Sequence, residues 1–338
     1  MFQPSAARRA KRRAALRAAL ALSMGVGALL GSVYAQREGR PFRIGRLVIG
    51  APESSAALFQ AQDEGLREHG LVEGRNVVTI SRWARGSIEA LEGLATELVA
   101  LPVDVIVAST NPSIAAAQRA TSTIPVVMVV GVEPVRNGFI ESLARPGRNV
   151  TGLTNEAGES MHGKMLQLLK EVAPTAFVIG VLAQQGVGYG RVPLEEAARL
   201  LGLELRYAPE VRQPADIEPA FEAMMAAGAK SLYVAGGGIL YQQRQTVTEL
   251  ALRHRLPSIF FSSDYVRAGG LASYGTDLRA QYRRSAWYVA RIFNGASPRE
   301  LPVEQPFRFE TAINAKTAKL LQLDIPRSLL LRTDEVIE

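Results

Sequence analysis

The stretch Glu133–Ile140, with the sequence EPVRNGFI, is echoed by Asp264–Leu271, with the sequence DYVRAGGL. Both read as an acid, any residue, Val-Arg, any residue, Gly, any residue and an aliphatic residue. Each follows an apolar run that opens at a proline, Pro125 in the first half and Pro257 in the second. So long a period predicts two similar lobes rather than a solenoid of short repeats. Acids just beyond two buried strands, one in each lobe, indicate a cleft between the lobes.

The elements around these two stretches follow the same order in both halves. The first half predicts strands at 43–49, 76–83, 104–108 and from 125, with helices at 56–69, 87–100 and from Asn111. The second half predicts strands at 177–182, 203–207, 231–235 and from 257, with helices at 191–201, 216–227 and 241–255. This alternation predicts an α/β fold with two doubly wound parallel sheets. Right-handed crossovers then place the carboxyl ends of the strands at one edge of each sheet, where ligands bind.

The chain is expected to cross between the lobes about three times. We expect residues 42–152 with about 275–304 to form lobe one, and residues 153–274 with about 305–325 to form lobe two and the hinge return. Residues 326–338 would form a C-terminal tail. A helix at 285–293 and a strand at 305–313 are predicted within the returning segments. Such a multi-segment hinge is suited to closing on a ligand.

Composition sets limits on the class of protein. The chain has 338 residues, enough for two domains, with 47% hydrophobic residues and a net charge of +7. Residues 1–35 hold six basic residues and no acid, which leaves +1 for the remainder. A nearly neutral body has no general attraction for phosphate backbones, so no nucleic-acid partner is expected.

The N-terminus is built like an export signal. Basic residues precede an apolar stretch from Ala18 to Leu30, and Val33 and Ala35 suit a signal peptidase site, so we expect a signal peptide cleaved after Ala35. The stretch is short for a retained membrane anchor, which needs about twenty residues. Both Sec and twin-arginine export remain open. The absence of cysteine excludes disulfides, thiolate metal sites, a cysteine nucleophile and a lipidated cysteine. We therefore expect a periplasmic protein.

Polar residues at the predicted strand ends are the candidate binding groups. Ser109, Thr110 and Asn111 stand where a strand ends and a helix begins, which suits a carboxylate, although plain helix capping explains them as well. Glu133 and Asp264 would bind an amino group from the two sides of the cleft. The alternatives are local pairing with the arginines three residues later, or acid–base catalysis, which nothing else in the chain supports.

Tyrosines and glycines also fall near the predicted cleft. Tyr189, Tyr241, Tyr265 and Tyr274 would stack on an apolar or aromatic ligand, but for any single one a surface position explains it better. The glycines at 186–190 and 236–238 match neither the dinucleotide nor the P-loop spacing, so they indicate turns or close approach to a ligand, and no cofactor is expected.

Signals for catalysis and metal binding are poor. Gly158–Gly163 (GESMHG) has one residue too many for a nucleophile elbow and lacks a preceding buried strand. His69, His162 and His254 lie far apart without the carboxylate spacing of a metal site, and all three are interpreted as helical and solvated. Neither catalytic residues nor metal ligands are therefore predicted.

Longer runs carry a family resemblance. They are Gly131–Val135, Ser142–Gly152, Ala268–Gly275 and the ending Ile325–Glu338. With these runs the chain resembles the ABC-importer substrate-binding proteins of the tryptophan/tyrosine type, over nearly the whole mature chain. The resemblance implies a type I periplasmic-binding fold and a receptor that closes on a small solute and docks onto an ABC permease at the inner membrane. Two features depart from the family pattern: Glu133 replaces a common aspartate, and the loop Gln184–Gly188 (QQGVG) replaces an Asn/Pro-rich loop.

The sequence thus predicts a monomeric, non-enzymatic solute receptor of an ABC importer. The candidate ligand-binding residues are Ser54, Ser109, Thr110, Asn111, Glu133, Gln184, Tyr189, Gly236, Asp264 and Tyr265. A secreted α/β hydrolase or transferase that uses the same cleft is the alternative, and a sugar-responsive regulator would need a DNA-binding headpiece in place of the signal. The solute stays open among an amino acid, a peptide fragment, an aromatic acid and a nucleoside.

Overall fold

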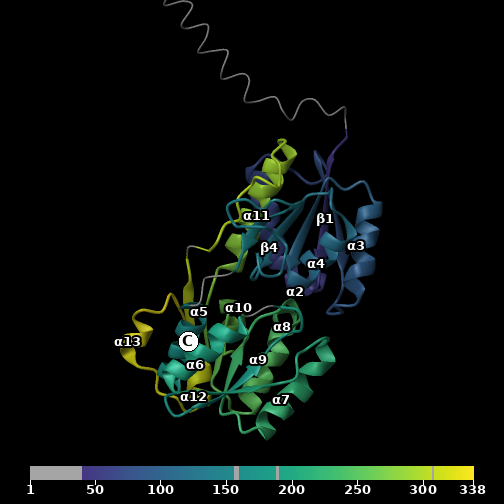
Figure 1. Ribbon diagram of the computed structural model, residues 1–338. Coiled ribbons are helices and arrows are strands. Elements are labelled where there is room, and N and C mark those ends of the chain that lie inside the picture. Colours follow the sequence, from purple (N-terminus) through teal and green to yellow (C-terminus); the bar gives the residue numbers. More distant parts are fainter. Residues whose placement is uncertain (1–39, 156–159, 188–189, 307) are drawn as a thin grey trace, which may run out of the picture. The chain divides into compact units, whose positions relative to one another are not determined.

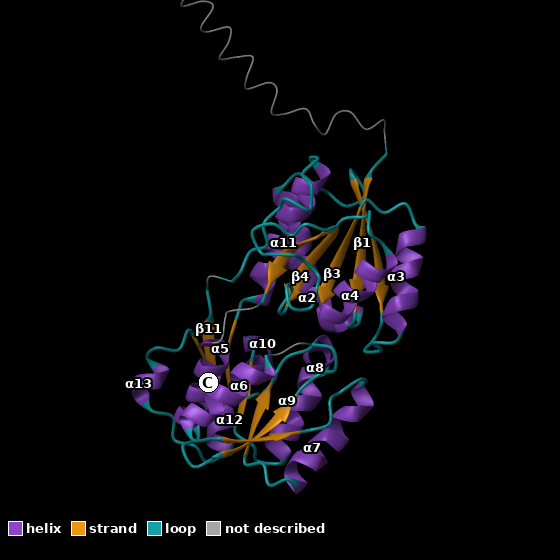
Figure 2. Ribbon diagram, viewed as in Figure 1, coloured by secondary structure: helices purple, strands orange, loops and turns teal. Residues whose placement is uncertain are grey.

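The computed structural model describes residues 40–155, 160–187, 190–306 and 308–338. The predicted signal peptide and its cleavage after Ala35 lie outside these residues. The described helices and strands all belong to one compact unit, Phe42–Glu338, which contains two separate β-sheets (Figures 1 and 2). The prediction of an α/β fold with two doubly wound lobes is confirmed.

The first sheet has five strands in the order β2-β1-β3-β4-β5, all parallel. Its strands are β1 (Phe42–Val48), β2 (Val77–Trp83), β3 (Val105–Thr110), β4 (Val126–Gly131) and β5 (Val150–Thr154). Strands β3 and β4 are almost wholly buried because helices cover the sheet on both sides, as their continuous apolar runs predict.

Four helices accompany this sheet: α2 (Pro52–Glu68), α3 (Ala90–Ala100), α4 (Asn111–Ala120) and α11 (Leu278–Phe293). α2 packs on α11, and α3 packs on α4 (Figure 1). The helix predicted from Ser87 begins at Ala90 instead, and the Ala90 N–H donates a hydrogen bond to the Ser87 hydroxyl just before it. α11 begins earlier than the predicted Ser285, capped by the Asp277 side chain, which accepts from the Ala280 N–H.

The second sheet has seven strands in the order β12-β11-β10-β9-β8-β6-β7. Its strands are β6 (Val178–Leu182), β7 (Glu204–Tyr207), β8 (Ser231–Val234), β9 (Ser258–Phe260), β10 (Ala272–Gly275), β11 (Glu310–Asn314) and β12 (Glu335–Ile337). β11 runs antiparallel to β10, so this sheet is mixed. The prediction that it is parallel throughout was wrong at this strand. The C-terminal segment supplies β12, which pairs parallel with β11.

The helices of the second lobe are mostly short. They are α5 (Ser160–Val172), α6 (Arg191–Leu201), the 3₁₀ turn η2 (Pro214–Asp216), α7 (Ile217–Ala226), α8 (Gly238–Gln242), α9 (Arg244–Arg253), α10 (Ser263–Arg267), α12 (Ala315–Leu320) and α13 (Arg327–Leu330). The single helix predicted at 241–255 is two helices, α8 and α9, because Gln243 between them departs from helical geometry with ψ +21°.

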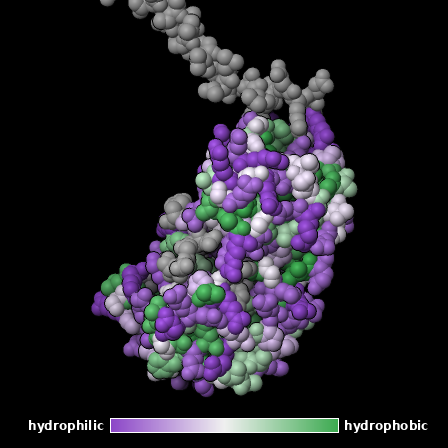
Figure 3. Space-filling model, in the orientation of Figure 1, coloured by the Kyte–Doolittle hydropathy of each residue, from purple (hydrophilic) through white to green (hydrophobic). Residues whose placement is uncertain are grey.

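The chain passes between the sheets after β5, after β10 and before β11. Helix α11 leaves the end of β10 and then packs against α2, β4 and β5 of the first sheet. On the face seen in Figure 3 hydrophilic side chains predominate and apolar ones form small separate patches. The large apolar side chains that are exposed, among them Phe177 and Leu331, come from separate parts of the chain.

Candidate ligand-binding site

A cavity of about 220 Å³ lies where the carboxyl ends of the strands of both sheets meet. Both lobes line it: the ends of β1, β3 and β4 with the residues that follow them in the first lobe, and the residues after β8 and β9 with the start of α8 in the second. The two lobes touch beside the cavity, since a Cβ added at Gly238 would lie 2.1 Å from the Ile49 side chain. Ligand pockets of roughly 300 to 1,000 Å³ hold drug-sized molecules, so this cavity suits a small solute.

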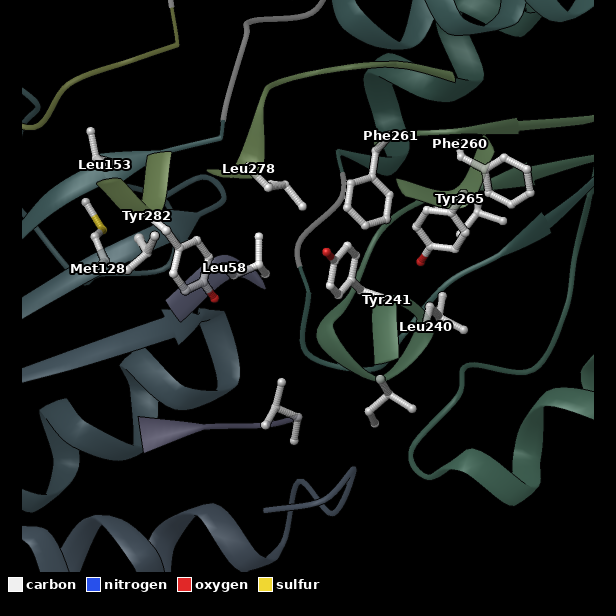
Figure 4. Packing of buried hydrophobic residues seen from close by; sticks show 14 of the residues in the cluster. Leu58, Met128, Leu153, Leu240, Tyr241, Phe260, Phe261, Tyr265, Leu278 and Tyr282 are labelled. Carbon is white, nitrogen blue, oxygen red and sulfur yellow. The ribbon is translucent and has the colours of Figure 1, made fainter. Parts of the chain in front are cut away.

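The first lobe contributes Tyr282 and Leu58 to the cavity wall (Figure 4). Tyr282 lies on the first turns of α11, and its ring packs edge-on against Phe59 of α2 at 5.2 Å between centroids. The two helices touch closely at Gly65, where a Cβ would come within 2.4 Å of the Arg283 carbonyl oxygen. The Gln62 amide donates to the Ser285 hydroxyl at 2.7 Å. These contacts hold Tyr282 against the first lobe.

The second lobe contributes Tyr241 and Phe261, on the other side of the cavity (Figure 4). Behind them Tyr265 is fully buried and stacks on Phe260 at 4.6 Å between centroids. The Tyr241 hydroxyl donates to Asp264 at 2.6 Å, which fixes the ring at the cavity wall. The cavity thus has an aromatic ring in each lobe, an arrangement suited to an apolar or aromatic body.

Several helices begin at the cavity, among them α2 after Gly50, α4 after Thr110 and α6 after Gly190. Their first N–H groups have no partner within the helix, and their dipoles favour negative charge. At α4 the Asn111 amide donates to the Val132 carbonyl and accepts from the Val132 N–H, both at 2.9 Å. This pair fixes the start of α4 beside the end of β4.

Glu133 lines the cavity beside these helix starts. Its backbone has φ +46°, an uncommon conformation for a residue with a side chain, and its carboxylate lies 3.1 Å from the Arg136 guanidinium. The carboxylate is 18% exposed and the arginine 69% exposed, so solvent screens this ion pair. Among the described residues that line the cavity there is no lysine or arginine, which leaves Glu133 as the charged side chain at its wall.

Of the residues predicted from the sequence, the structure places Ser109, Thr110, Asn111, Glu133 and Gly236 on the cavity wall. Ser54, Gln184, Asp264 and Tyr265 lie outside the lining, and Tyr189 lies outside the described residues. The Ser54 hydroxyl donates to the Ala51 carbonyl at 3.1 Å, and its neighbour Ser55 reaches the cavity instead. The side-chain amide oxygen of Gln184 accepts from the Ile239 N–H at 2.7 Å and so holds the start of α8.

Asp264 has three partners that keep it from the cavity. Besides Tyr241, it accepts from Arg267 at 3.0 Å and pairs with Arg279 of α11 at 3.1 Å. Burial alone would raise the pKa of Asp264, but the Tyr241 hydroxyl and the two guanidinium groups together hold it below its ordinary value. Asp264 is therefore an ionised anchor behind Tyr241.

The sequence missed His162, which lies on α5 and lines the cavity. The prediction that it is solvated was wrong: it is 9% exposed, and its Nδ1 lies 2.6 Å from the Tyr233 hydroxyl. Burial lowers the pKa of His162 to about 4, so the ring is neutral at pH 7. The sequence did not indicate that His162 is buried. Met165 and Leu166 mark the helix as amphipathic, but they do not show whether its buried face extends as far as His162.

A family model described as ABC transporter substrate binding protein matches residues 48–337. The chain belongs to this family. The resemblance drawn from the sequence is confirmed at that level, and because the family consists of solute-binding proteins, the cavity of this substrate-binding protein is a binding site and not an active site. Proteins of this family work in the periplasm or outside the cell.

Known relatives of this substrate-binding protein agree with the family match. The curated Tyrosine-binding protein of Clostridioides difficile (strain R20291) is 25% identical over 263 residues, which cover 77% of this chain and 75% of the relative. A conserved domain protein from Vibrio cholerae O1 biovar eltor str. N16961 is 26% identical, with a TM-score of 0.81 over 88% of this chain and 100% of that one. The ABC domain in complex with L-Trp from Streptococcus pneumonia, 23% identical, shares the fold with a TM-score of 0.80 over the same fractions.

Within 40–155, 160–187, 190–306 and 308–338 no cluster of three or more His, Asp or Glu side chains could hold a metal ion. In those same ranges no helix combines the length and the apolar character that a membrane crossing requires.

Proposed function

We propose that this substrate-binding protein captures an aromatic amino acid, or a close analogue, between its two lobes and delivers it to an ABC permease for import. The observation that carries the proposal is the aromatic cavity, with Tyr282 on one side and Tyr241 on the other, whose polar groups gather at the ends of the first-lobe strands. A relative named for tyrosine binding and a structural neighbour that holds L-Trp support the choice of solute.

The polar edge of the cavity suits the two charged groups of an amino acid. The starts of α2 and α4 offer unpaired N–H groups to a carboxylate, with the Ser109 and Thr110 hydroxyls beside them. Glu133 offers a negative charge to an ammonium group. The aromatic side chain of the solute would then lie between Tyr282 and Tyr241. Ser54, Gln184, Asp264 and Tyr265 act through their neighbours in this arrangement, and direct contact by Tyr189 stays a prediction.

The proposal includes a site of action and a mode of working. The protein works as a monomer in the periplasm, after Sec or twin-arginine export and cleavage behind Ala35, with no nucleic-acid partner. The lobes, divided near residue 152 and again between 275 and 305, close on the solute, and the closed form is the one that the permease recognises. Ligand binding shifts the population toward that form.

Thermal unfolding with added solutes tests the proposal. L-Tryptophan, L-tyrosine and L-phenylalanine are compared with ribose and adenosine. A solute at a hundred times its Kd should stabilise the protein by about 2.7 kcal/mol. Tyr282→Ala and Tyr241→Ala should each weaken the best solute at least tenfold, about 1.4 kcal/mol. Tyr207→Ala is the matched control. This tyrosine lies on β7, stacks under Arg191 and is not part of the cavity lining.

The proposed solute class would be refuted if no aromatic amino acid raised the unfolding temperature at millimolar concentration while ribose or adenosine did. Equal loss of binding in Tyr207→Ala and Tyr282→Ala would instead show that the solute does not bind in this cavity. Isothermal titration of the same proteins gives the Kd values directly.

A further inference from the structure

His162 has no part in the function proposed above, although it lies on the cavity wall. Its ring belongs to the second lobe, where α5 packs against α6 and against β9 and β10. Buried histidines often serve only as packing groups, so the question is whether one ring nitrogen remains available to a solute. The answer follows from the partners of the two nitrogens.

Nδ1 is engaged by the hydroxyl of Tyr233 at 2.6 Å. Tyr233 lies on β8 and is 1% exposed, so its hydroxyl has no access to bulk water. The same oxygen lies 3.4 Å from the Met165 sulfur, a much weaker acceptor than an imidazole nitrogen. Of these two acceptors the imidazole nitrogen is the stronger, which favours donation of the phenol proton to Nδ1. Since a neutral imidazole carries one proton, that proton must then lie on Nε2.

Nε2 lies on the side of the ring that faces Gly190. A Cβ added at Gly190 would lie 2.9 Å from Nε2, so any other residue would cover this nitrogen. Gly190 has φ +68°, a conformation that glycine adopts without strain, and it lines the same cavity as His162. Because Gly190 has no side chain, it does not itself cover the Nε2 edge at the cavity wall.

We propose that His162 donates a hydrogen bond from Nε2 to an oxygen acceptor on the side chain of the solute. His162 thereby makes the protein prefer a solute with a phenol or carbonyl oxygen at the α5–α6 wall over the same skeleton without it. This inference rests on the proposed function and narrows its solute class. A site that hydrogen-bonds a polar group rejects the analogue that lacks the group, because the buried donor is left unpaired.

The neutral state of the ring supports this role. The pKa of His162, lowered to about 4 by burial, keeps the imidazole uncharged at the near-neutral pH of binding. An uncharged donor discriminates by geometry and does not attract anions in general. The charged side chain at the cavity wall, Glu133, lies in the first lobe, where it would meet the ammonium group of the proposed solute.

The first experiment needs no solute. The chain has three histidines, so nitrogen-15 NMR of the imidazoles can be assigned with His69→Gln and His254→Gln. At pH 7 His162 should show the tautomer with the proton on Nε2, and Tyr233→Phe should convert it to a mixture. A proton on Nδ1 in the unmutated protein would overturn the donor role, whatever the solute proves to be.

The second experiment measures discrimination by isothermal titration. L-Tyrosine and L-phenylalanine differ by one hydroxyl, and the unmutated protein should prefer tyrosine about tenfold. His162→Phe should remove the preference while it changes the Kd of phenylalanine less than about twofold. His162→Gln, which keeps a donor, should retain part of the preference and serves if the first variant does not fold. His254→Phe, on a histidine that stacks on Phe221 outside the cavity lining, is the control and should keep the full preference.

The outcomes separate the two proposals. If neither amino acid binds the unmutated protein, the proposed function fails, and the solute preference assigned to His162 fails with it. If both bind and His162→Phe discriminates as well as the unmutated protein, the proposed function stands and the inference about His162 is overturned.

Discussion

The turns Glu133–Ile140 and Asp264–Leu271 share a sequence pattern but treat their acids differently. In both, the acid pairs with the arginine three residues later, at 3.1 Å in the first and 3.0 Å in the second. Glu133 has no further ion pair among the described residues and faces the cavity. Asp264 has two more partners, Tyr241 and Arg279, and lies behind the cavity wall. One carboxylate is free to meet a solute and the other positions a tyrosine.

A repeated sequence motif predicts the local structure of both turns but not the contacts that each turn makes with distant segments. The repeat correctly places each acid shortly after a buried strand, and the pairing with the nearby arginine, which the sequence offered as the alternative to solute binding, is present in both turns. It does not say what packs around the acid, because that depends on distant segments: α11 brings Arg279 to Asp264, and no cation of the second lobe pairs with Glu133 within the described ranges. Two similar turns can therefore serve binding and support respectively.

The largest expected difference between the two turns is in stability. Asp264→Ala should lower the free energy of unfolding by about 3 kcal/mol, because it leaves two guanidinium groups and a buried hydroxyl without their acceptor. Glu133→Ala should lower it by less than about 1 kcal/mol, because its ion pair is screened by solvent. Urea unfolding of both variants measures the difference. Equal losses would show that the two carboxylates are equivalent supports.

The next largest effect is the loss of stability at acidic pH, which we expect to come from His162 and not from the acids of the two turns. Since the folded pKa of His162 is about 4 and its unfolded value about 6.5, the unfolded chain binds the proton more tightly. Stability should fall as pH drops through this window, by about 2 kcal/mol between pH 8 and pH 5. The lowered pKa of Asp264 acts in the same direction but at lower pH: its stabilisation is full above about pH 4 and is lost only as the pH falls below that value.

Urea unfolding at pH 8, 6.5 and 5 checks this effect. His162→Phe should abolish the decrease, whereas Asp264→Asn should keep it on a lower baseline. If the decrease persisted in His162→Phe, its source would lie elsewhere in the chain.

The smallest expected effect is on affinity. Glu133→Gln should weaken the best amino-acid solute about tenfold, about 1.4 kcal/mol, with little change in stability, since it removes the negative charge opposite the ammonium group. Glu92→Gln is the matched control, because this acid pairs with Arg119 on the exposed surface. Titration calorimetry gives both Kd values. An unchanged Kd in Glu133→Gln would leave the amino group of the solute to another part of the cavity.

Much of the fold could be predicted because its signals are local. Proline openings, apolar runs and glycine stops predicted the strand–helix alternation in both halves. The direction of β11 could not be predicted, since an apolar strand reads alike in either direction. The break between α8 and α9 at Gln243 was also hidden, because the helical spacing continues across it.

The candidate site was predictable as a neighbourhood and less so as individual side chains. Strand ends led to Ser109, Thr110, Asn111 and Glu133, but successive helical residues point about 100° apart, so a shift of one position changes which side chain enters the cavity. Ser55 lines it where Ser54 was expected. Tyr282 and His162 come from helices that reach the cavity only through tertiary packing, and no strand-end rule finds them.

The close fit of Gly65 against the Arg283 carbonyl has a consequence for the order of events when a solute departs. With no room for even a methyl group between α2 and α11, Tyr282 should move together with α2 and the first sheet, on which α11 also packs. If the lobes open as proposed, Tyr241 and Phe261 would retreat while the opposite ring stays with the first lobe. A departing molecule would lose its contacts with the second lobe first and rest briefly on Tyr282 before it leaves.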